Sequence, residues 1–183
     1  MLRIAVAQFN ATVGDLTGNV ERIITYAAEA KARGAQVLLT PELALCGYPP
    51  EDLLLRPDFY RACSRALDDL AGRVEGIASG LAIVVGHPEE HAGRRYNAAT
   101  VIENGHKKAV YRKIRLPNYE VFDEMRYFDA GSEACVVTLG GVRCGINICA
   151  DIWEAGAAEL AHGAGAELLL VLNASPCHLE KHQ

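Results

Sequence analysis

The residue best placed for nucleophilic chemistry is Cys149. It follows an apolar segment at 142–148 with the pattern of a strand, and it precedes a segment at 151–162 with the pattern of a helix. A sulfur at such a turn would lie beside the exposed N–H groups of the helix start, which favour a thiolate. A buried structural cysteine would fit the same position. The position of Cys149 alone therefore leaves both interpretations open.

Two charged residues also stand where apolar segments end. Glu42 closes a predicted strand at 35–42, and Lys113 follows one at 109–112. A carboxylate at a strand end suits a general base, and a lysine there could hold the negative oxygen of a tetrahedral intermediate. Taken separately, each could equally be a solvated charge. With Cys149, they make a candidate nucleophile, a candidate base and a candidate cation.

The segments that must position these residues alternate between strand and helix patterns. Strands are predicted at 2–9, 35–42, 81–86, 98–103, 109–112, 136–139, 142–148 and 168–172, and helices at 19–33, 58–78 and 151–162. This order favours one α/β domain whose sheets are covered on both faces. Residues 115–132 fit neither pattern, and their aromatic side chains indicate a functional loop rather than disorder.

The composition fits a soluble α/β domain. The chain has 183 residues, of which 50% are hydrophobic and 22% are charged, with a formal net charge of −5. A mildly acidic chain without a run of like charges is a poor partner for nucleic acid or an anionic membrane. No signal peptide or spanning segment is predicted. Six cysteines without a C-x-x-C pair suit a reducing compartment, so we expect a cytoplasmic protein.

Several short motifs occur in a fixed order along the chain. They are Pro-Glu-Leu at 41–43, Gly-Tyr-Pro-Pro-Glu-Asp at 47–52, Arg-Lys at 112–113, Leu-Pro-Asn-Tyr at 116–119, Val-Phe-Asp-Glu at 121–124, Gly-Ile-Asn-Ile-Cys at 145–149, Asp-Ile-Trp at 151–153 and Asn-Ala-Ser-Pro at 173–176. In this combination the chain resembles the nitrilase superfamily. Within it, the Gly-Tyr-Pro-Pro-Glu-Asp and Phe-Asp-Glu segments are similar to the glutamine-hydrolysing domains of NAD synthetases.

The resemblance implies a nitrilase-like αββα sandwich and a role for each matched residue. Glu42 would be the general base, Lys113 the stabilising cation and Cys149 the nucleophile. Glutamine, the implied substrate, would be bound by three further residues, Tyr119, Glu124 and Ser175. The ammonia released would serve the amidation of deamido-NAD to NAD.

The resemblance also implies partners and a longer protein. Residues 1–183 would form a single carbon-nitrogen hydrolase domain that is incomplete at its C-terminal end, followed in the family by a synthetase domain that uses ATP and Mg²⁺. No Gly-rich pyrophosphate loop of that domain occurs in this chain. The amidohydrolase step itself would need no cofactor. Homo-oligomers are expected for this superfamily.

Two other functions remain open from the sequence. A free-standing amidase or carbamoylase of the same superfamily would share the three catalytic residues. An inactive, truncated domain that serves only as an interaction module is the other alternative, because Ala150 stands where the family usually has Glu. His87 and His91 are four residues apart, as are His178 and His182, which is the spacing of metal ligands on a helix. Pro88 disfavours a helix between the first two, so no metal site is predicted.

Overall fold

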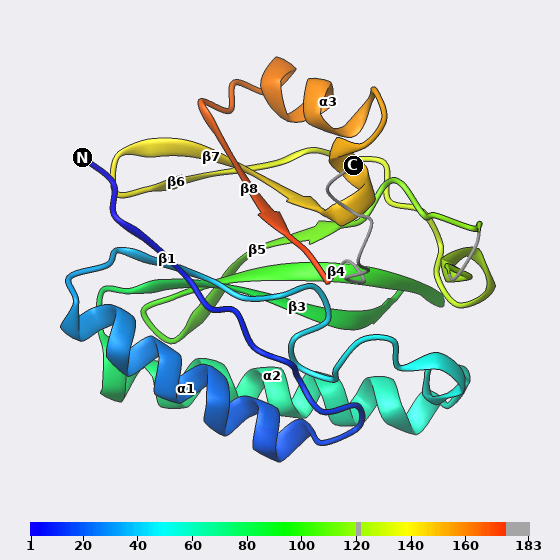
Figure 1. Ribbon diagram of the computed structural model, residues 1–183, viewed down its shortest axis with the longest axis horizontal. Coiled ribbons are helices and arrows are strands. Elements are labelled where there is room, and N and C mark those ends of the chain that lie inside the picture. Colours follow the sequence, from blue (N-terminus) through cyan, green and yellow to red (C-terminus); the bar gives the residue numbers. More distant parts are fainter. Residues whose placement is uncertain (120–121, 175–183) are drawn as a thin grey trace, which may run out of the picture.

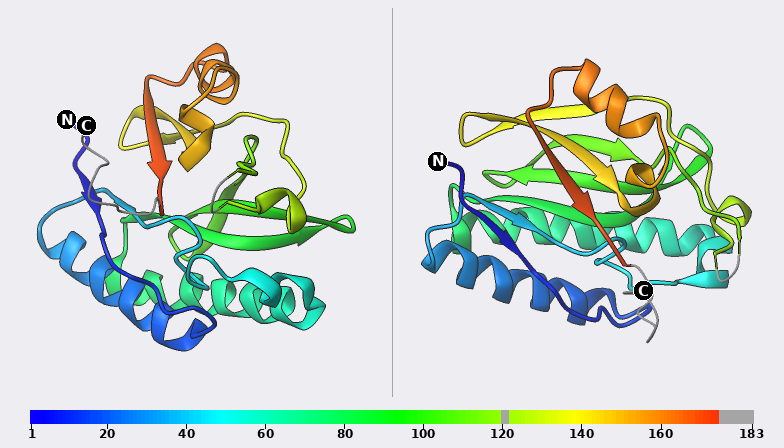
Figure 2. Two further views of the ribbon diagram at one scale, coloured as in Figure 1. Left: turned by 45° about the vertical axis from the view of Figure 1, so that its right-hand side comes forward. Right: turned by 45° about the horizontal axis from the view of Figure 1, so that its top comes forward.

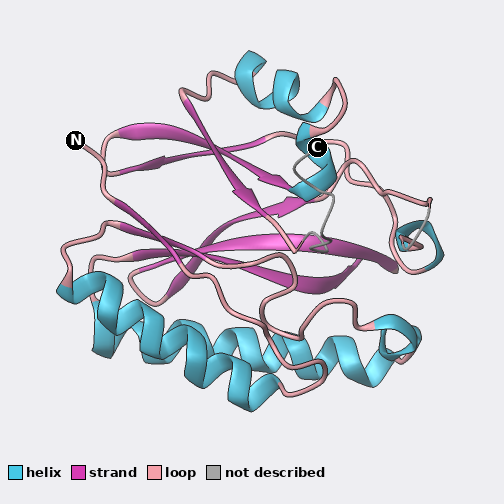
Figure 3. Ribbon diagram, viewed as in Figure 1, coloured by secondary structure: helices cyan, strands magenta, loops and turns pink. Residues whose placement is uncertain are grey.

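Two β-sheets pack face to face, and helices cover their outer faces. The computed structural model describes residues 1–119 and 122–174. Helices α1 and α2 lie against the larger sheet and α3 lies on the smaller one, which gives four layers in the order α, β, β, α (Figures 1 and 3). The αββα sandwich expected from the resemblance is confirmed.

The larger sheet has five strands in the order β1-β2-β3-β4-β5, and the smaller has three in the order β6-β7-β8. In the larger sheet β1, β2 and β3 are parallel, and β3, β4 and β5 are antiparallel; in the smaller sheet β7 and β8 are parallel. The strands are β1 (Ile4–Val6), β2 (Val37–Leu39), β3 (Ala82–His91), β4 (Arg94–Glu103), β5 (His106–Arg112), β6 (Cys135–Leu139), β7 (Val142–Ile148) and β8 (Leu168–Leu172). The α-helices are α1 (Leu16–Ala32), α2 (Pro57–Ala78) and α3 (Ala157–Gly163), and short 3₁₀ turns are η1 (Glu51–Leu55), η2 (Glu124–Arg126) and η3 (Cys149–Ile152).

The long helices begin and end where local chemistry dictates. The Asp15 side chain accepts a hydrogen bond from Gly18 N at 2.9 Å and caps α1, and Gly34 adopts a positive φ of 74° just after that helix. Pro57 occupies the first turn of α2, where its missing N–H has no partner to lose. None of the helices in residues 1–119 and 122–174 is long and apolar enough to cross a membrane.

Two apolar cores hold the layers together. One lies between α1, α2 and the larger sheet, and includes Ile23, Leu70 and Ile83, each fully buried. The other lies between the two sheets, and includes Val84, Ile146 and Leu172. β3 contributes to both cores because successive side chains of a strand point to opposite faces. This explains why its sequence reads as a continuous apolar run.

The predicted elements are present, with three differences. The strands predicted at 2–9 and 35–42 are shorter, at Ile4–Val6 and Val37–Leu39, so Glu42 lies beyond the end of β2 rather than in the strand. β3 and β4 extend much further than expected, to a hairpin turn at Ala92 and Gly93, so His87 and Pro88 lie within a strand. The single helix predicted at 151–162 is wrong: the chain forms η3, leaves helical geometry and restarts as α3. Gly156 explains the break, because its φ of 130° is incompatible with a continuous helix.

The fold brings the ends of three strands to one end of the sandwich. Glu42 follows β2, Lys113 follows β5 and Cys149 follows β7. At this end the backbone N–H of Glu42 donates to the carbonyl of Asn173, just after β8, and so joins the two sheets. The path of β8 toward the loop after β2 is visible in Figure 2. Residues from both sheets therefore line the same region.

Candidate active site

Glu42 and Lys113 form a buried ion pair. The Lys113 Nζ donates to Glu42 Oε1 at 2.7 Å. Lys113 is 1% exposed and Glu42 is 2% exposed. The side-chain amide of Asn97, on β4, donates to the same carboxylate oxygen at 2.8 Å. The backbone carbonyl of Asn97 accepts the backbone N–H of Lys113. A buried charge is tolerated only where it is paired and hydrogen-bonded. These contacts fix both side chains in one arrangement.

The Glu42 backbone is also held by close packing. Gly86 on β3 runs directly against the turn after β2, and a Cβ added to Gly86 would lie 2.5 Å from Leu43 N and 2.6 Å from Pro41 O. Both contacts would be with backbone atoms, which have little room to move. The absence of a side chain at Gly86 is therefore what allows Glu42 its position.

Glu124 is the third member of this cluster. Its two carboxylate oxygens accept from Lys113 Nζ at 2.8 and 2.9 Å, so one lysine faces two carboxylates. Burial and the nearby charge of Glu42 raise the pKa of Glu124 to about 7, against the opposing effect of Lys113. Burial alone would lower the pKa of Lys113, but Glu42 and Glu124 outweigh it and raise that pKa above its ordinary value. Lys113 is thus held as a cation.

Cys149 sits at the turn between β7 and η3. Its φ is 44°, a left-handed conformation that is uncommon for any residue other than glycine, and the residue is 2% exposed. Burial, with the charges of Glu42, Glu124 and Cys149, raises the pKa of Tyr48 above its ordinary value. The Tyr48 hydroxyl donates to Glu124 Oε1 at 3.4 Å. Tyr48 thus lies within electrostatic range of the thiol and in contact with the carboxylate cluster.

Three cavities open around these residues. The largest, about 510 Å³, is lined by Glu42, Tyr48 and the ends of β1 and β8. A second, about 350 Å³, is lined by Tyr48 and Glu124, so Tyr48 borders both cavities. A third, about 390 Å³, is lined by Tyr119, Ala150 and Trp153. Glu42 and Glu124 therefore each border a cavity, and Ala150, which follows Cys149, borders the third.

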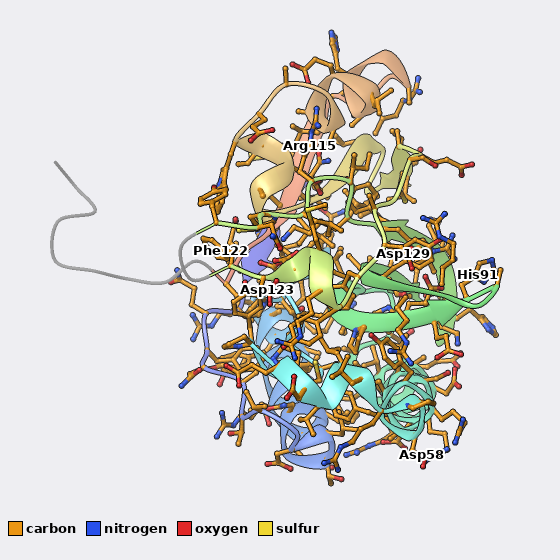
Figure 4. The ribbon with its side chains drawn as sticks, turned by 90° about the vertical axis from the view of Figure 1, so that its right-hand side faces the viewer. Asp58, His91, Arg115, Phe122, Asp123 and Asp129 are labelled. Atoms are coloured by element: carbon orange, nitrogen blue, oxygen red, sulfur yellow. The ribbon has the colours of Figure 1, made fainter. Side chains whose placement is uncertain are left out.

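Aromatic side chains line the outer part of the loop at 115–132. Tyr119 is 51% exposed and packs edge-on against Phe122, with ring centroids 5.8 Å apart, and Phe122 packs in the same way against Trp153 at 5.9 Å. Figure 4 shows Phe122 and Asp123 on the opposite side of the molecule from His91, which lies at the tip of the β3–β4 hairpin. These rings form an open aromatic rim beside Ala150.

The predicted site residues are only partly brought together. Glu42, Lys113 and Glu124 are in direct contact, whereas Tyr119 lies on the rim. Ser175 lies outside the described residues. Sequence reasoning missed Asn97, although a signal was present: it is the polar residue that begins an otherwise apolar stretch of β4. No group of three or more metal-ligating side chains occurs within residues 1–119 and 122–174.

Comparisons with known proteins agree with this geometry. The family model for carbon-nitrogen hydrolase matches residues 3–183. A glutamine-dependent NAD(+) synthetase from Xanthomonas campestris pv. campestris (strain 8004) is 50% identical over 184 residues, which cover 99% of this chain and 33% of that protein. The chain thus spans about a third of the length of this curated relative.

Solved structures give the same match in three dimensions. The glutamine-dependent NAD+ synthetase from Acinetobacter baumannii, in complex with adenosine diphosphate, superposes with a TM-score of 0.89 at 34% identity, over 98% of this chain and 34% of that one. A variant of the amidase from Nesterenkonia sp. AN1, with acrylamide added to its active-site cysteine, superposes with a TM-score of 0.81 at 29% identity. That match covers 94% of this chain and 67% of the amidase.

Proposed function

Because this chain belongs to the carbon-nitrogen hydrolase family, we propose that it is the glutamine-hydrolysing domain of a glutamine-dependent NAD(+) synthetase. Residues 1–183 form one domain in this proposal. The observation that carries it is the buried contact of Lys113 with Glu42 and Glu124, at the end of the sandwich where Cys149 turns out of β7. The high identity to the synthetase from Xanthomonas campestris supports the choice of glutamine.

In the first half of the reaction, Cys149 attacks the side-chain amide of glutamine. The Glu42 carboxylate accepts the thiol proton while a bond forms between Sγ and the amide carbon. The negative oxygen of the tetrahedral intermediate is held by the Lys113 ammonium and by the backbone N–H of Ala150. Glu42 then returns the proton to the amide nitrogen, the C–N bond breaks and ammonia leaves. A thioester with Cys149 remains.

In the second half, water releases glutamate from Cys149. Glu42 accepts a proton from the attacking water, the same two donors hold the oxyanion, and the proton passes to the departing sulfur. The balance is glutamine plus water to glutamate plus ammonia, so protein side chains and water suffice without a cofactor. Loss of the base costs about 10²- to 10⁴-fold in rate, and loss of one oxyanion donor about 10²- to 10³-fold.

Glu124 has two duties in this proposal. It holds the Lys113 ammonium by both carboxylate oxygens, which keeps the cation in place for the oxyanion. It also borders the cavity shared with Tyr48, where it would attract the α-ammonium of glutamine. Tyr119 on the aromatic rim and Ser175 complete the proposed binding set.

The ammonia would amidate deamido-NAD to NAD in a synthetase domain of the full-length protein. That domain would use ATP and Mg²⁺, and it would account for length that the relatives have beyond this chain. A homo-oligomeric assembly is part of the same proposal. None of these functions requires a residue of the cluster around Lys113 to bind a nucleotide.

A second candidate function is that of an amidase acting on simpler amides. The match to the Nesterenkonia amidase favours it, since that protein carries an active-site cysteine in the same fold. A panel of glutamine, acetamide, acrylamide and carbamoyl amino acids separates the two. Preference for glutamine supports the synthetase branch, and preference for a small aliphatic amide supports the amidase.

The decisive experiment measures glutamate release from glutamine by the 183-residue chain and by two cysteine variants. We expect Cys149→Ala to abolish release and to block acrylamide labelling at residue 149. Cys135→Ala is the matched control, because Cys135 is a half-buried cysteine on β6 outside the carboxylate cluster. Release that persists in Cys149→Ala would remove Cys149 as the nucleophile. A folded wild-type chain that releases no glutamate would contradict the proposed activity of this domain.

A further inference from the structure

The carboxylate of Asp151 accepts four hydrogen bonds in the interior of the protein. Its Oδ1 accepts the backbone N–H groups of Ile114 at 3.1 Å and Arg115 at 2.8 Å. Its Oδ2 accepts the backbone N–H of Ile148 at 2.9 Å and the hydroxyl of Tyr111 at 2.8 Å. Asp151 is 0% exposed. Each oxygen thus has two donors.

These four donors come from the two segments that carry the proposed cation and nucleophile. Ile114 follows Lys113 directly, in the chain leaving β5 of the larger sheet. Ile148 directly precedes Cys149, at the end of β7 in the smaller sheet. A single side chain therefore holds the backbone beside Lys113 and the backbone beside Cys149.

The Tyr111 hydroxyl reinforces this link. Tyr111 belongs to β5 and is 1% exposed, and its hydroxyl also accepts from the side-chain amide of Asn147 on β7 at 3.3 Å. The three polar side chains of Tyr111, Asn147 and Asp151 thus cross the otherwise apolar space between the sheets. Burial raises the pKa of Asp151, and the hydrogen bonds from Arg115, Ile148 and Tyr111 oppose that rise.

We propose that Asp151 is a positioning residue that sets the placement of Cys149 relative to Lys113. This inference rests on the proposed function, because it assigns Asp151 a part in that reaction. Apolar side chains could fill the space between two sheets without the cost of burying a carboxylate. Apolar contacts are not directional, whereas four hydrogen bonds to one carboxylate fix two backbones at once. A misplacement of about 1 Å between reacting groups can cost about 10²-fold in rate.

The test is Asp151→Asn in the 183-residue chain. The amide has the shape of the carboxylate but presents an NH₂ group on one side, so two of the four donors lose their acceptor in either orientation. We expect the kcat for glutamate release to fall about 10- to 100-fold with KM within about twofold, because the glutamine-binding residues are elsewhere. Hydrogen exchange should accelerate about tenfold or more at the backbone amides that lose their acceptor. These are the amides of Ile114 and Arg115 in one orientation of the new amide side chain, and the amide of Ile148 in the other.

Two further variants keep the test sharp if Asp151→Asn folds poorly. Tyr111→Phe removes one donor and preserves the ring, and we expect a smaller loss of kcat in the same direction. Thr100→Val is the control, because it removes a buried hydrogen bond between Thr100 and His87. These two side chains lie on the opposite face of the larger sheet from Asp151, so the substitution leaves the donors to Asp151 in place. It should lower the melting temperature while leaving kcat and exchange at Ile114 and Ile148 unchanged.

The outcomes separate this inference from the proposed function. A wild-type chain without glutamate release contradicts the proposed function. A wild-type chain that is active, with Asp151→Asn and Tyr111→Phe changing kcat and exchange no more than Thr100→Val, overturns the positioning role. A rise in KM with unchanged kcat would likewise overturn it, since that result assigns Asp151 to substrate binding.

Discussion

Glu124 makes the stability of the protein depend on pH in a direction opposite to that of most carboxylates. Its pKa rises from 4.5 to about 7 on folding, chiefly through burial and the charge of Glu42. The folded state therefore binds a proton that the unfolded state releases between these two values. Stability from this group is fully present below about pH 4.5 and is lost as the pH rises through 7. This rise in pKa corresponds to about 3 kcal/mol in total.

The variant Glu124→Gln isolates this effect because it cannot titrate. We expect the free energy of unfolding of the wild type, relative to that of Glu124→Gln, to fall by about 2 to 3 kcal/mol between pH 5 and pH 8. Urea denaturation at several pH values in this range measures it. His87, whose pKa is lowered by burial, works in the opposite direction. It is present in both proteins, so its contribution cancels in the difference.

The exposed residue Glu154 provides the control, since Glu154→Gln removes a carboxylate far less buried than that of Glu124. The reasoning about Glu124 is refuted if the difference between wild type and Glu124→Gln is flat across this range, or if the wild type gains relative stability as the pH rises. The second result would mean that Lys113 outweighs burial and the charge of Glu42.

Three further substitutions test how the site is held. Gly86→Ala should destabilise the protein by about 1 to 3 kcal/mol and lower the rate of glutamate release, because the Cβ of the new alanine would clash with the backbone at Leu43. Thermal unfolding measures the stability, and the glutamate assay measures the rate. Gly72→Ala, on the exposed face of α2 with no atom within 4 Å of the new Cβ, should instead stabilise the protein by about 0.5 to 1 kcal/mol without changing activity. Asn97→Ala should cost about 1 to 3 kcal/mol in urea denaturation and slow glutamate release, because Glu42 loses a buried donor; unchanged values for both would contradict the role assigned to that amide.

The positions of Glu42, Lys113 and Cys149 after strands could be predicted from the sequence, but the contacts around them could not. Glu42, Lys113 and Cys149 each follow an apolar strand, and that pattern is local. Their meeting depends on which strands pair and on how two separate sheets face each other, and neither is written in a local pattern. Glu124 illustrates the limit: the resemblance implied a role in binding glutamine, and nothing in the sequence predicted that both of its oxygens also contact Lys113.

The elements that departed from prediction did so for physical reasons. Residues 151–162 have helical periodicity throughout, but Asp151 turns its side chain to the Ile148 N–H and Gly156 adopts a conformation that no α-helix contains. Trp153 lies in this break and is 43% exposed, with its ring against Phe122. Tertiary contacts overrode the periodic signal at these positions.

Under the proposed function, the left-handed backbone at Cys149 implies that this position meets two opposing requirements. A φ of 44° is adopted most readily by glycine and, after it, by asparagine or aspartate, none of which carries a thiol. Selection for stability alone would therefore favour a different residue from the cysteine that the proposed reaction requires. In the proposed reaction, the start of η3 therefore has a less stable backbone conformation in exchange for a thiol, and the rest of the sandwich supplies the compensating stability.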